Sequence, residues 1–126
     1  MMTRGYNPLT AYKQSKLCDM LLAKGLNDRY REKGIRAYAV DPGLVKTDIG
    51  TKAGGIVKLA WRFRKPFGVS PAIPAETYAW ICRQKKHPEA LYYYKSAPRS
   101  YSCQVNKHNA DRLFLLSHQL CGTGEK

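Results

Sequence analysis

The chain has 126 residues, and its hydrophobic share of 44% and charged share of 25% are typical of a single small globular domain with a modest core. Its apolar runs are only a few residues long, and residues 1–5 lead into polar sequence, so neither a membrane-spanning helix nor a secretory signal is predicted. We therefore expect a cytoplasmic location.

The net charge of +13 favours polyanionic partners, but the basic residues are scattered, with short clusters only at 62–65 and 83–86. A solvated basic surface is the preferred interpretation. A nucleic-acid-binding protein usually concentrates its basic residues in one stripe, so nucleic-acid binding is not expected.

The four cysteines stand far apart in the sequence, with no Cys-x-x-Cys pair and no histidine at a ligand-like interval. These spacings predict no metal site. In the reducing compartment expected for this chain the cysteines remain thiols. Cys18 and Cys82 fall within apolar helical patterns, so we expect both to be small buried residues.

A long helix is predicted for the first part of the chain. Asn7 is a good N-cap and Pro8 suits the first helical position. Apolar residues then recur at helical spacing to about Lys33, and Gly34 is suited to end the helix. The apolar positions are Leu9, Leu17, Met20, Leu21 and Leu26. A β-compatible run over 35–40 follows, and a helix, one glycine and a strand are the second half of a βαβ unit, which predicts a parallel sheet.

The remainder of the chain mixes loops with short elements. Residues 44–74 are rich in glycine and proline, and a loop of this length is usually functional. The elements expected from this point are a short helix over 56–63, a helix from Pro74 to about Gln84, an aromatic strand over 91–95, a loop over 96–105, and a last helix over 110–120 with Asn109 as its cap and Gly122 beyond its end.

Tyr12 and Lys16 are the residues best suited to chemistry. Four positions apart on a helix, they share one face, and an ammonium beside a phenol stabilises the phenolate. A unit charge 4 Å away at an effective dielectric near 20 supplies about 4 kcal/mol, enough to lower a tyrosine pKa of about 10 by up to roughly three units. With nine tyrosines and thirteen lysines, roughly one such spacing arises by chance, so a surface tyrosine beside a solvated lysine is the alternative.

The context of this pair resembles a known family. The run "AYKQSKL", followed one helix later by "AVDPGLVKTDIG", resembles the Tyr-x-x-x-Lys helix and the Pro-Gly-x-x-x-Thr turn of the short-chain dehydrogenases/reductases. The runs "SPAIPAETYAWI" and "NADRLFLLSHQLCG" look like later helices of the retinol dehydrogenase-like subgroup. The resemblance extends from Tyr6 to Gly122.

This resemblance implies an α/β fold, the C-terminal part of a Rossmann-type doubly wound parallel sheet whose N-terminal cofactor-binding half is absent. Residues 1–126 would be one part of a single domain. Its segments would be the catalytic helix (6–33), the strand and nicotinamide-contacting turn (35–47), the substrate loop (48–74), and the terminal helices with the last strand (75–122).

The resemblance also implies an NAD(P)-dependent oxidoreductase that interconverts an alcohol and a carbonyl compound. Tyr12 would be the general acid/base, and Lys16 would activate it and bond the nicotinamide ribose. The cofactor-binding positions would be Tyr12, Lys16, Pro42, Gly43, Val45 and Thr47. Asp41 departs from the Asn or His more usual before Pro-Gly. The choice between NAD and NADP would depend on the missing half.

Substrate specificity is expected in residues 48–74, whose apolar and aromatic side chains suit a lipophilic alcohol or carbonyl compound. The interleaved basic residues would also suit an anionic membrane surface, and a loop helix that only closes the core is an equally good interpretation. By itself the chain is expected to have weak or no activity, and the intact family form is expected to be a homo-oligomer. The alternative function is a non-enzymatic basic module that contacts polyanions or a membrane surface.

Overall fold

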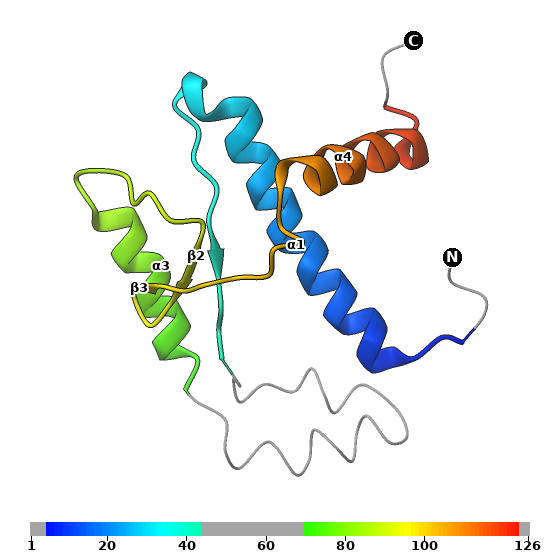
Figure 1. Cartoon of the computed structure of the whole chain (residues 1–126). Coiled ribbons are helices and arrows are strands. Elements are labelled where there is room, and N and C mark those ends of the chain that lie inside the picture. Colours follow the sequence, from blue (N-terminus) through cyan, green and yellow to red (C-terminus); the bar gives the residue numbers. More distant parts are fainter. Residues whose placement is uncertain (1–4, 44–69, 124–126) are drawn as a thin grey trace.

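A computed structural model describes residues 5–43 and 70–123 of the chain (Figure 1). The expected helix over 56–63 and nearly all of the expected substrate loop lie outside these residues. The described elements are helix α1 (Pro8–Tyr30), the 3-10 turn η1 (Arg31–Lys33), strand β1 (Ala39–Val40), helix α3 (Ala72–Arg83), strands β2 (Tyr92–Tyr94) and β3 (Ala97–Pro98), and helix α4 (Lys107–Cys121). The chain is therefore an α/β protein, as its sequence predicts.

Helix α1 begins and ends as its sequence predicts. The Asn7 side chain accepts hydrogen bonds from the backbone N–H groups of Leu9 (2.9 Å) and Thr10 (3.4 Å), and Pro8 occupies the first helical position. After η1, Gly34 adopts a left-handed conformation with φ of 81°, which costs glycine nothing sterically. These local signals fix where the long helix stops and the chain turns back towards the sheet.

Three strands form the sheet in the order β1-β2-β3. β1 pairs with β2 in parallel, which confirms the prediction, whereas β2 and β3 pair antiparallel. β3 lies in a segment expected to be loop. Its hairpin turns through Lys95 and Ser96, both at positive φ, a pattern that tight hairpins usually build with Asn-Gly or Gly-Gly. The sequence carries no such signal here.

The strand expected over 35–40 is also shorter than predicted, since only Ala39–Val40 pairs in the sheet. The preceding backbone is held by a side chain of α1 instead. Asn27 donates to the carbonyl of Ala37 (2.6 Å) and accepts from its N–H (2.9 Å), so one side-chain amide takes the place of a neighbouring strand.

The two later helices both start earlier than expected. α3 begins at Ala72 rather than Pro74, because Pro71 stands at the cap position and the Ser70 hydroxyl accepts from the Ala72 N–H (3.3 Å). α4 is capped by Asn106 rather than Asn109.

Both asparagines suit a cap, but the side chain of Asn106 accepts the N–H of Asn109 (2.9 Å), while the Asn109 amide donates to the Gln104 carbonyl (2.9 Å). The expected end at Gly122 is confirmed by its φ of 64°.

Helices cover both faces of the sheet. Along β1 side chains alternate, so Ala39 packs against the cluster that includes Leu21 of α1, whereas Tyr38 faces the other way. On that second face the Tyr93 ring lies 5.9 Å from Tyr38 and 5.7 Å from Trp80 of α3. The result is a small three-layer arrangement of α1, sheet and α3 (Figure 1).

Helix α4 crosses α1 at a glycine. An ideal Cβ added to Gly25 would lie 2.4 Å from the Phe114 ring, so the absence of a side chain lets the two helices approach. The guanidinium of Arg29 lies 4.0 Å from the centroid of the same ring and donates to Asp111 (2.9 Å). This contact joins the two ends of the described chain.

The expected burial of Cys18 and Cys82 is wrong, because both side chains are exposed. The core is too small to cover every apolar helical position. It consists of a few buried residues with partly buried neighbours, and α1 turns Leu21, Ala23 and Gly25 inward. Leu9, also counted in the apolar pattern, is 51% exposed.

We expect the contact between α1 and α4 to weaken in acid. Hydrogen bonding to Lys107 and the nearby charges of Lys107 and Arg29 hold the pKa of Asp111 below its ordinary value of 3.8. A carboxyl group with a lowered folded-state pKa contributes stability that is present above the unfolded pKa and lost as the pH falls through the folded pKa. In urea unfolding at pH 6, the wild type should therefore have a higher free energy of unfolding than Asp111→Asn. This difference should disappear as the pH falls to 2.

A buried hydroxyl fixes the turn between β2 and β3. Thr77 of α3 is 1% exposed, and its hydroxyl accepts the N–H of Ser96 (3.1 Å). Thr77→Val keeps the shape but removes the acceptor, so the free energy of unfolding should fall by about 1–3 kcal/mol. Thr10→Val, at an exposed position of α1, is the matched control and should change it by less than about 0.5 kcal/mol in the same urea titration.

Candidate functional site

Tyr12 and Lys16 lie on one face of α1, near its beginning. The Lys16 ammonium is 5.7 Å from the centroid of the Tyr12 ring, and the tyrosine side chain is about half exposed. The helix therefore brings the two polar groups together as their spacing predicts. The hydroxyl of Ser15, between them in sequence, donates back to the Tyr12 carbonyl (2.7 Å) and so faces the helix backbone.

Asp19 completes this group, and the sequence analysis missed it. The Lys16 ammonium donates to the Asp19 carboxylate at 2.9 Å. This hydrogen bond is the main reason why the pKa of Lys16 is raised above its ordinary value, so the ammonium keeps its charge at higher pH. The spacing of three residues between the lysine and the aspartate is the signal that could have identified the pair.

The same tyrosine–lysine distance occurs at the other end of the helix, where the Lys33 ammonium lies 5.7 Å from the Tyr30 ring. The distance between ring and ammonium therefore does not by itself identify a catalytic pair. The two pairs differ in where they lie along α1. The first turns of α1 lie at the end of the molecule where β1 finishes, whereas the last turn of α1, which ends at Tyr30, lies at the opposite end (Figure 1). In open α/β sheets, ligands bind beyond the carboxyl ends of the strands. Tyr12 and Lys16 are the pair at that end.

Directly after β1 comes the strand-end turn, which is residues 41–43. The Asp41 N–H donates to the Tyr93 carbonyl (2.8 Å), and the Asp41 side chain accepts the N–H of Gly43 (2.8 Å). Gly43 has a φ of 67°, a conformation that favours glycine. The turn therefore contains Pro42 and Gly43 of the predicted site. Val45 and Thr47, the other predicted nicotinamide contacts, lie outside the described residues.

A second charged group, also missed in the sequence, holds this turn. Arg99, which follows β3, forms an ion pair with Asp41, and its guanidinium lies 4.8 Å from the centroid of the Tyr94 ring. Partial burial raises the pKa of Tyr92, and the charge of Asp41 and a hydrogen bond to it raise it further. Because β3 was expected to be loop, no pattern in the sequence indicated that Arg99 lies beside residue 41.

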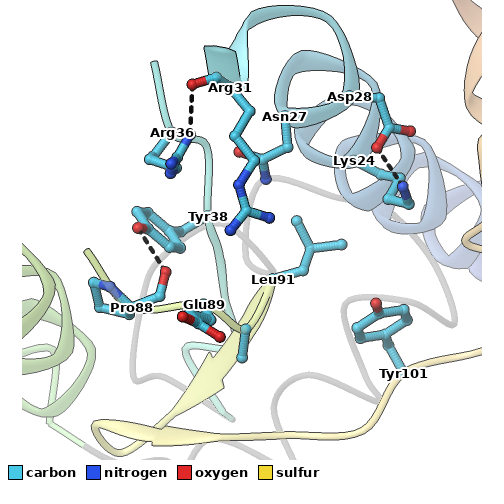
Figure 2. Close-up of a pocket in the computed structure, with 11 residues that line it drawn as sticks. Lys24, Asn27, Asp28, Arg31, Arg36, Tyr38, Pro88, Glu89, Leu91 and Tyr101 are labelled. Atoms are coloured by element: carbon cyan, nitrogen blue, oxygen red, sulfur yellow. Dashed lines mark hydrogen bonds and ion pairs between the residues drawn. The ribbon is translucent and has the colours of Figure 1, made fainter. Parts of the chain in front are cut away.

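A pocket of about 310 Å³ lies at the other end of the sheet, and Figure 2 shows the residues around it. Its walls come from the last turns of α1, the segments 36–38 and 88–91, and Tyr101. Tyr38 donates to the Pro88 carbonyl (2.9 Å), and Arg36 donates to the carbonyl of Arg31 (2.8 Å). Of the predicted site residues that the structure describes, which are Tyr12, Lys16, Pro42 and Gly43, none lines this pocket, so it is separate from the strand-end turn.

Within residues 5–43 and 70–123, no group of three or more His, Cys, Asp or Glu side chains is placed to hold a metal ion. In the same part of the chain, no helix is long and apolar enough to cross a membrane.

Sequence comparison identifies curated relatives of the chain. It is 34% identical over 116 residues to retinol dehydrogenase 12 of Mus musculus, an alignment that covers 89% of this chain and 36% of the relative. Human retinol dehydrogenase 12 is 29% identical over the same coverage, and human retinol dehydrogenase 13 is 40% identical over 52 residues, which are 41% of this chain and 16% of the relative. No protein-family model matches the chain, and no solved structure matches it. The chain thus spans only about a third of the length of retinol dehydrogenase 12.

These relatives correct one expectation. A cytoplasmic location was predicted from the lack of a signal or a long apolar run, and this prediction is wrong, because retinol dehydrogenases 12 and 13 are membrane-associated, microsomal proteins. Nor do the relatives support the alternative of a non-enzymatic basic binding module.

Proposed function

Because the chain is a homologue of the retinol dehydrogenases of the short-chain dehydrogenase/reductase family, we propose that it carries the proton-transfer and nicotinamide-contacting part of an NAD(P)-dependent oxidoreductase. The reaction is the interconversion of an alcohol and a carbonyl compound. The observation that carries the proposal is the position of Tyr12 and Lys16 on α1, at the end of the molecule where the parallel strand β1 finishes.

Tyr12 acts as the general acid/base. Its hydroxyl gives a proton to the carbonyl oxygen in reduction and takes one from the alcohol in oxidation. Lys16 holds its ammonium 5.7 Å from the Tyr12 ring, and a 2.9 Å hydrogen bond to Asp19 fixes the ammonium in place. When bound, NAD or NADP supplies or accepts the hydride.

The residues at the end of β1 suit the nicotinamide end of that cofactor. Gly43 has no Cβ and a φ of 67°, so a flat ring can approach its backbone closely. Pro42 and Gly43 present the turn, and the family resemblance assigns Lys16 to a ribose hydroxyl of the cofactor. By the family resemblance, Val45 and Thr47 extend the contact to the carboxamide.

We propose a lipophilic alcohol or carbonyl compound as substrate, in keeping with the retinol named in its relatives, with residues 48–74 determining specificity. The chain alone should be a weak enzyme or inactive, since the glycine-rich phosphate loop of the family has no counterpart in it. Exposed apolar residues such as Leu9 and Leu22 of α1 are available to pair with a second copy in the complete enzyme.

The test is a hybrid enzyme in which this chain replaces the aligned segment of mouse retinol dehydrogenase 12. We expect the hybrid to reduce or oxidise its nicotinamide cofactor with retinal or retinol, measured by absorbance, with the unmodified mouse protein as the reference. A well-folded hybrid that binds cofactor but shows no turnover would contradict the proposal. So would salt-sensitive binding of polyanions by the chain with no response to nicotinamide.

A further inference from the structure

We propose that Arg99 is a positioning residue, which acts through Asp41 to hold Gly43 where a nicotinamide ring can lie against it. The inference rests on the proposed function and adds to it a residue that the family motifs do not contain. It concerns only the strand-end turn and the hairpin beside it.

The sheet register places Arg99 and Asp41 on the same face. Ala39 is paired with Tyr92, and Arg99 donates its backbone N–H to the Tyr92 carbonyl (2.9 Å). Side chains alternate along strands, so positions 39 and 41 of the first strand, Tyr92 of the second, and Arg99 beside it share one face. Arg99 can therefore reach across β2 to the end of β1.

Asp41 connects this arginine to the turn, because its two oxygens have different partners. Oδ1 accepts the N–H of Gly43 at 2.8 Å, and Oδ2 pairs with the guanidinium of Arg99. The carboxylate is the less exposed partner, since its side chain is 21% exposed against 48% for the arginine. A second contact, with the Tyr94 ring at 4.8 Å, also holds the guanidinium.

Loss of the arginine would release the turn. Without the guanidinium the carboxylate loses its ion pair and keeps the hydrogen bond with Tyr92, and its rotation towards water would break the hydrogen bond that fixes Gly43. It would also leave an unpaired negative charge beside the place proposed for a phosphate-bearing cofactor. Arg99 thus sets both the shape and the charge of this part of the site.

The first experiment measures amide hydrogen exchange in the 126-residue chain by NMR. Arg99→Ala should raise the exchange rate of the Gly43 amide about tenfold, as expected for losing a charge-assisted hydrogen bond, while the Ala39 amide within the sheet keeps its rate. Lys95→Ala is the matched control. Lys95 lies 5.3 Å from the same Tyr94 ring and carries the same charge, and its removal should leave Gly43 unchanged.

Two conservative variants separate positioning from packing. Asp41→Asn keeps the acceptor for the Gly43 amide but removes the ion pair, and Arg99→Lys keeps the charge but loses the forked donor. We expect Arg99→Lys to restore part of the protection lost in Arg99→Ala. In a protein that already carries Asp41→Asn, adding Arg99→Ala should change the exchange rate of the Gly43 amide little further. Unchanged exchange at Gly43 in Arg99→Ala, or equal loss in Lys95→Ala, would overturn the inference.

The second experiment titrates the same variants with reduced nicotinamide mononucleotide, a probe that lacks the adenosine half. In the wild type the Gly43 amide signal should shift, and Arg99→Ala should raise the dissociation constant about tenfold, equivalent to about 1.4 kcal/mol. If the wild type shows no shift, the proposed function fails while the exchange result still decides the role of Arg99. If the wild type responds and Arg99→Ala binds equally well, the inference fails and the proposed function stands.

Discussion

Tyr12→Phe in the hybrid enzyme is expected to lower kcat by about a hundredfold to ten-thousandfold, the usual contribution of a general acid or base. The ring and its packing are kept, and only the hydroxyl to which we assign the proton transfer is removed. The fall should appear in kcat with little change in the affinity for the nicotinamide cofactor, measured by fluorescence titration.

Tyr30→Phe is the control, because the chain repeats the same local geometry at that position. The Lys33 ammonium lies as far from the Tyr30 ring as the Lys16 ammonium lies from the Tyr12 ring, 5.7 Å in each case. The pairs differ in spacing, four residues against three, in the Asp19 partner that Lys16 has, and in position, since α1 ends at Tyr30. Full activity in Tyr12→Phe, or an equal loss in Tyr30→Phe, would show that the proposed general acid/base is wrongly assigned.

Gly25→Ala should destabilise the fold by about 1–3 kcal/mol, the usual cost of overpacking. In an ordinary helix Gly→Ala raises stability by about 1 kcal/mol, so a loss of stability here would by itself indicate a clash. The added Cβ would lie 2.4 Å and 2.9 Å from two carbons of Phe114 and 3.0 Å from the Arg29 guanidinium, which forces α4 away from α1.

Urea unfolding measures this effect, and Phe114→Leu provides the second half of a double-mutant cycle. With the ring gone, Gly25→Ala should cost much less than it does in the wild type, because the clash is with the ring. An increase in stability for Gly25→Ala alone would mean that α4 does not rest on Gly25 in solution.

The sequence predicted those parts of the fold that depend on local signals. Asn7, Pro8 and Gly34 specify the ends of α1 through hydrogen bonds and backbone conformations that involve only near neighbours. The strand at 92–94 was predicted from its aromatic residues, and its parallel pairing with β1 agrees with the parallel sheet predicted from the order of helix, glycine and strand. The starts of α3 and α4 were displaced by two or three residues because neighbouring residues compete for the same cap.

Features that depend on contacts between distant residues were not predicted. β3 exists because Lys95 and Ser96 accept positive φ within a hairpin that Thr77 of α3 supports. The ion pair between Asp41 and Arg99 depends in turn on β3. Of the candidate site, the shared face of Tyr12 and Lys16 could be predicted from their spacing, and so could the Asp19 partner of Lys16, but the Arg99 partner of the strand-end turn could not.

The ion pair at the strand-end turn can form only late during synthesis of the chain on the ribosome. Asp41 and Arg99 are 58 residues apart, and Arg29 and Asp111, which join α1 to α4, are 82 residues apart. A ribosome releases the tyrosine-bearing helix and the turn well before it adds the residues that hold them. Contacts between such distant residues form late and slowly. During synthesis α1 therefore leaves the ribosome before Arg99 can hold the strand-end turn, and chains cut short before residue 99 would carry Tyr12 and Lys16 without this ion pair.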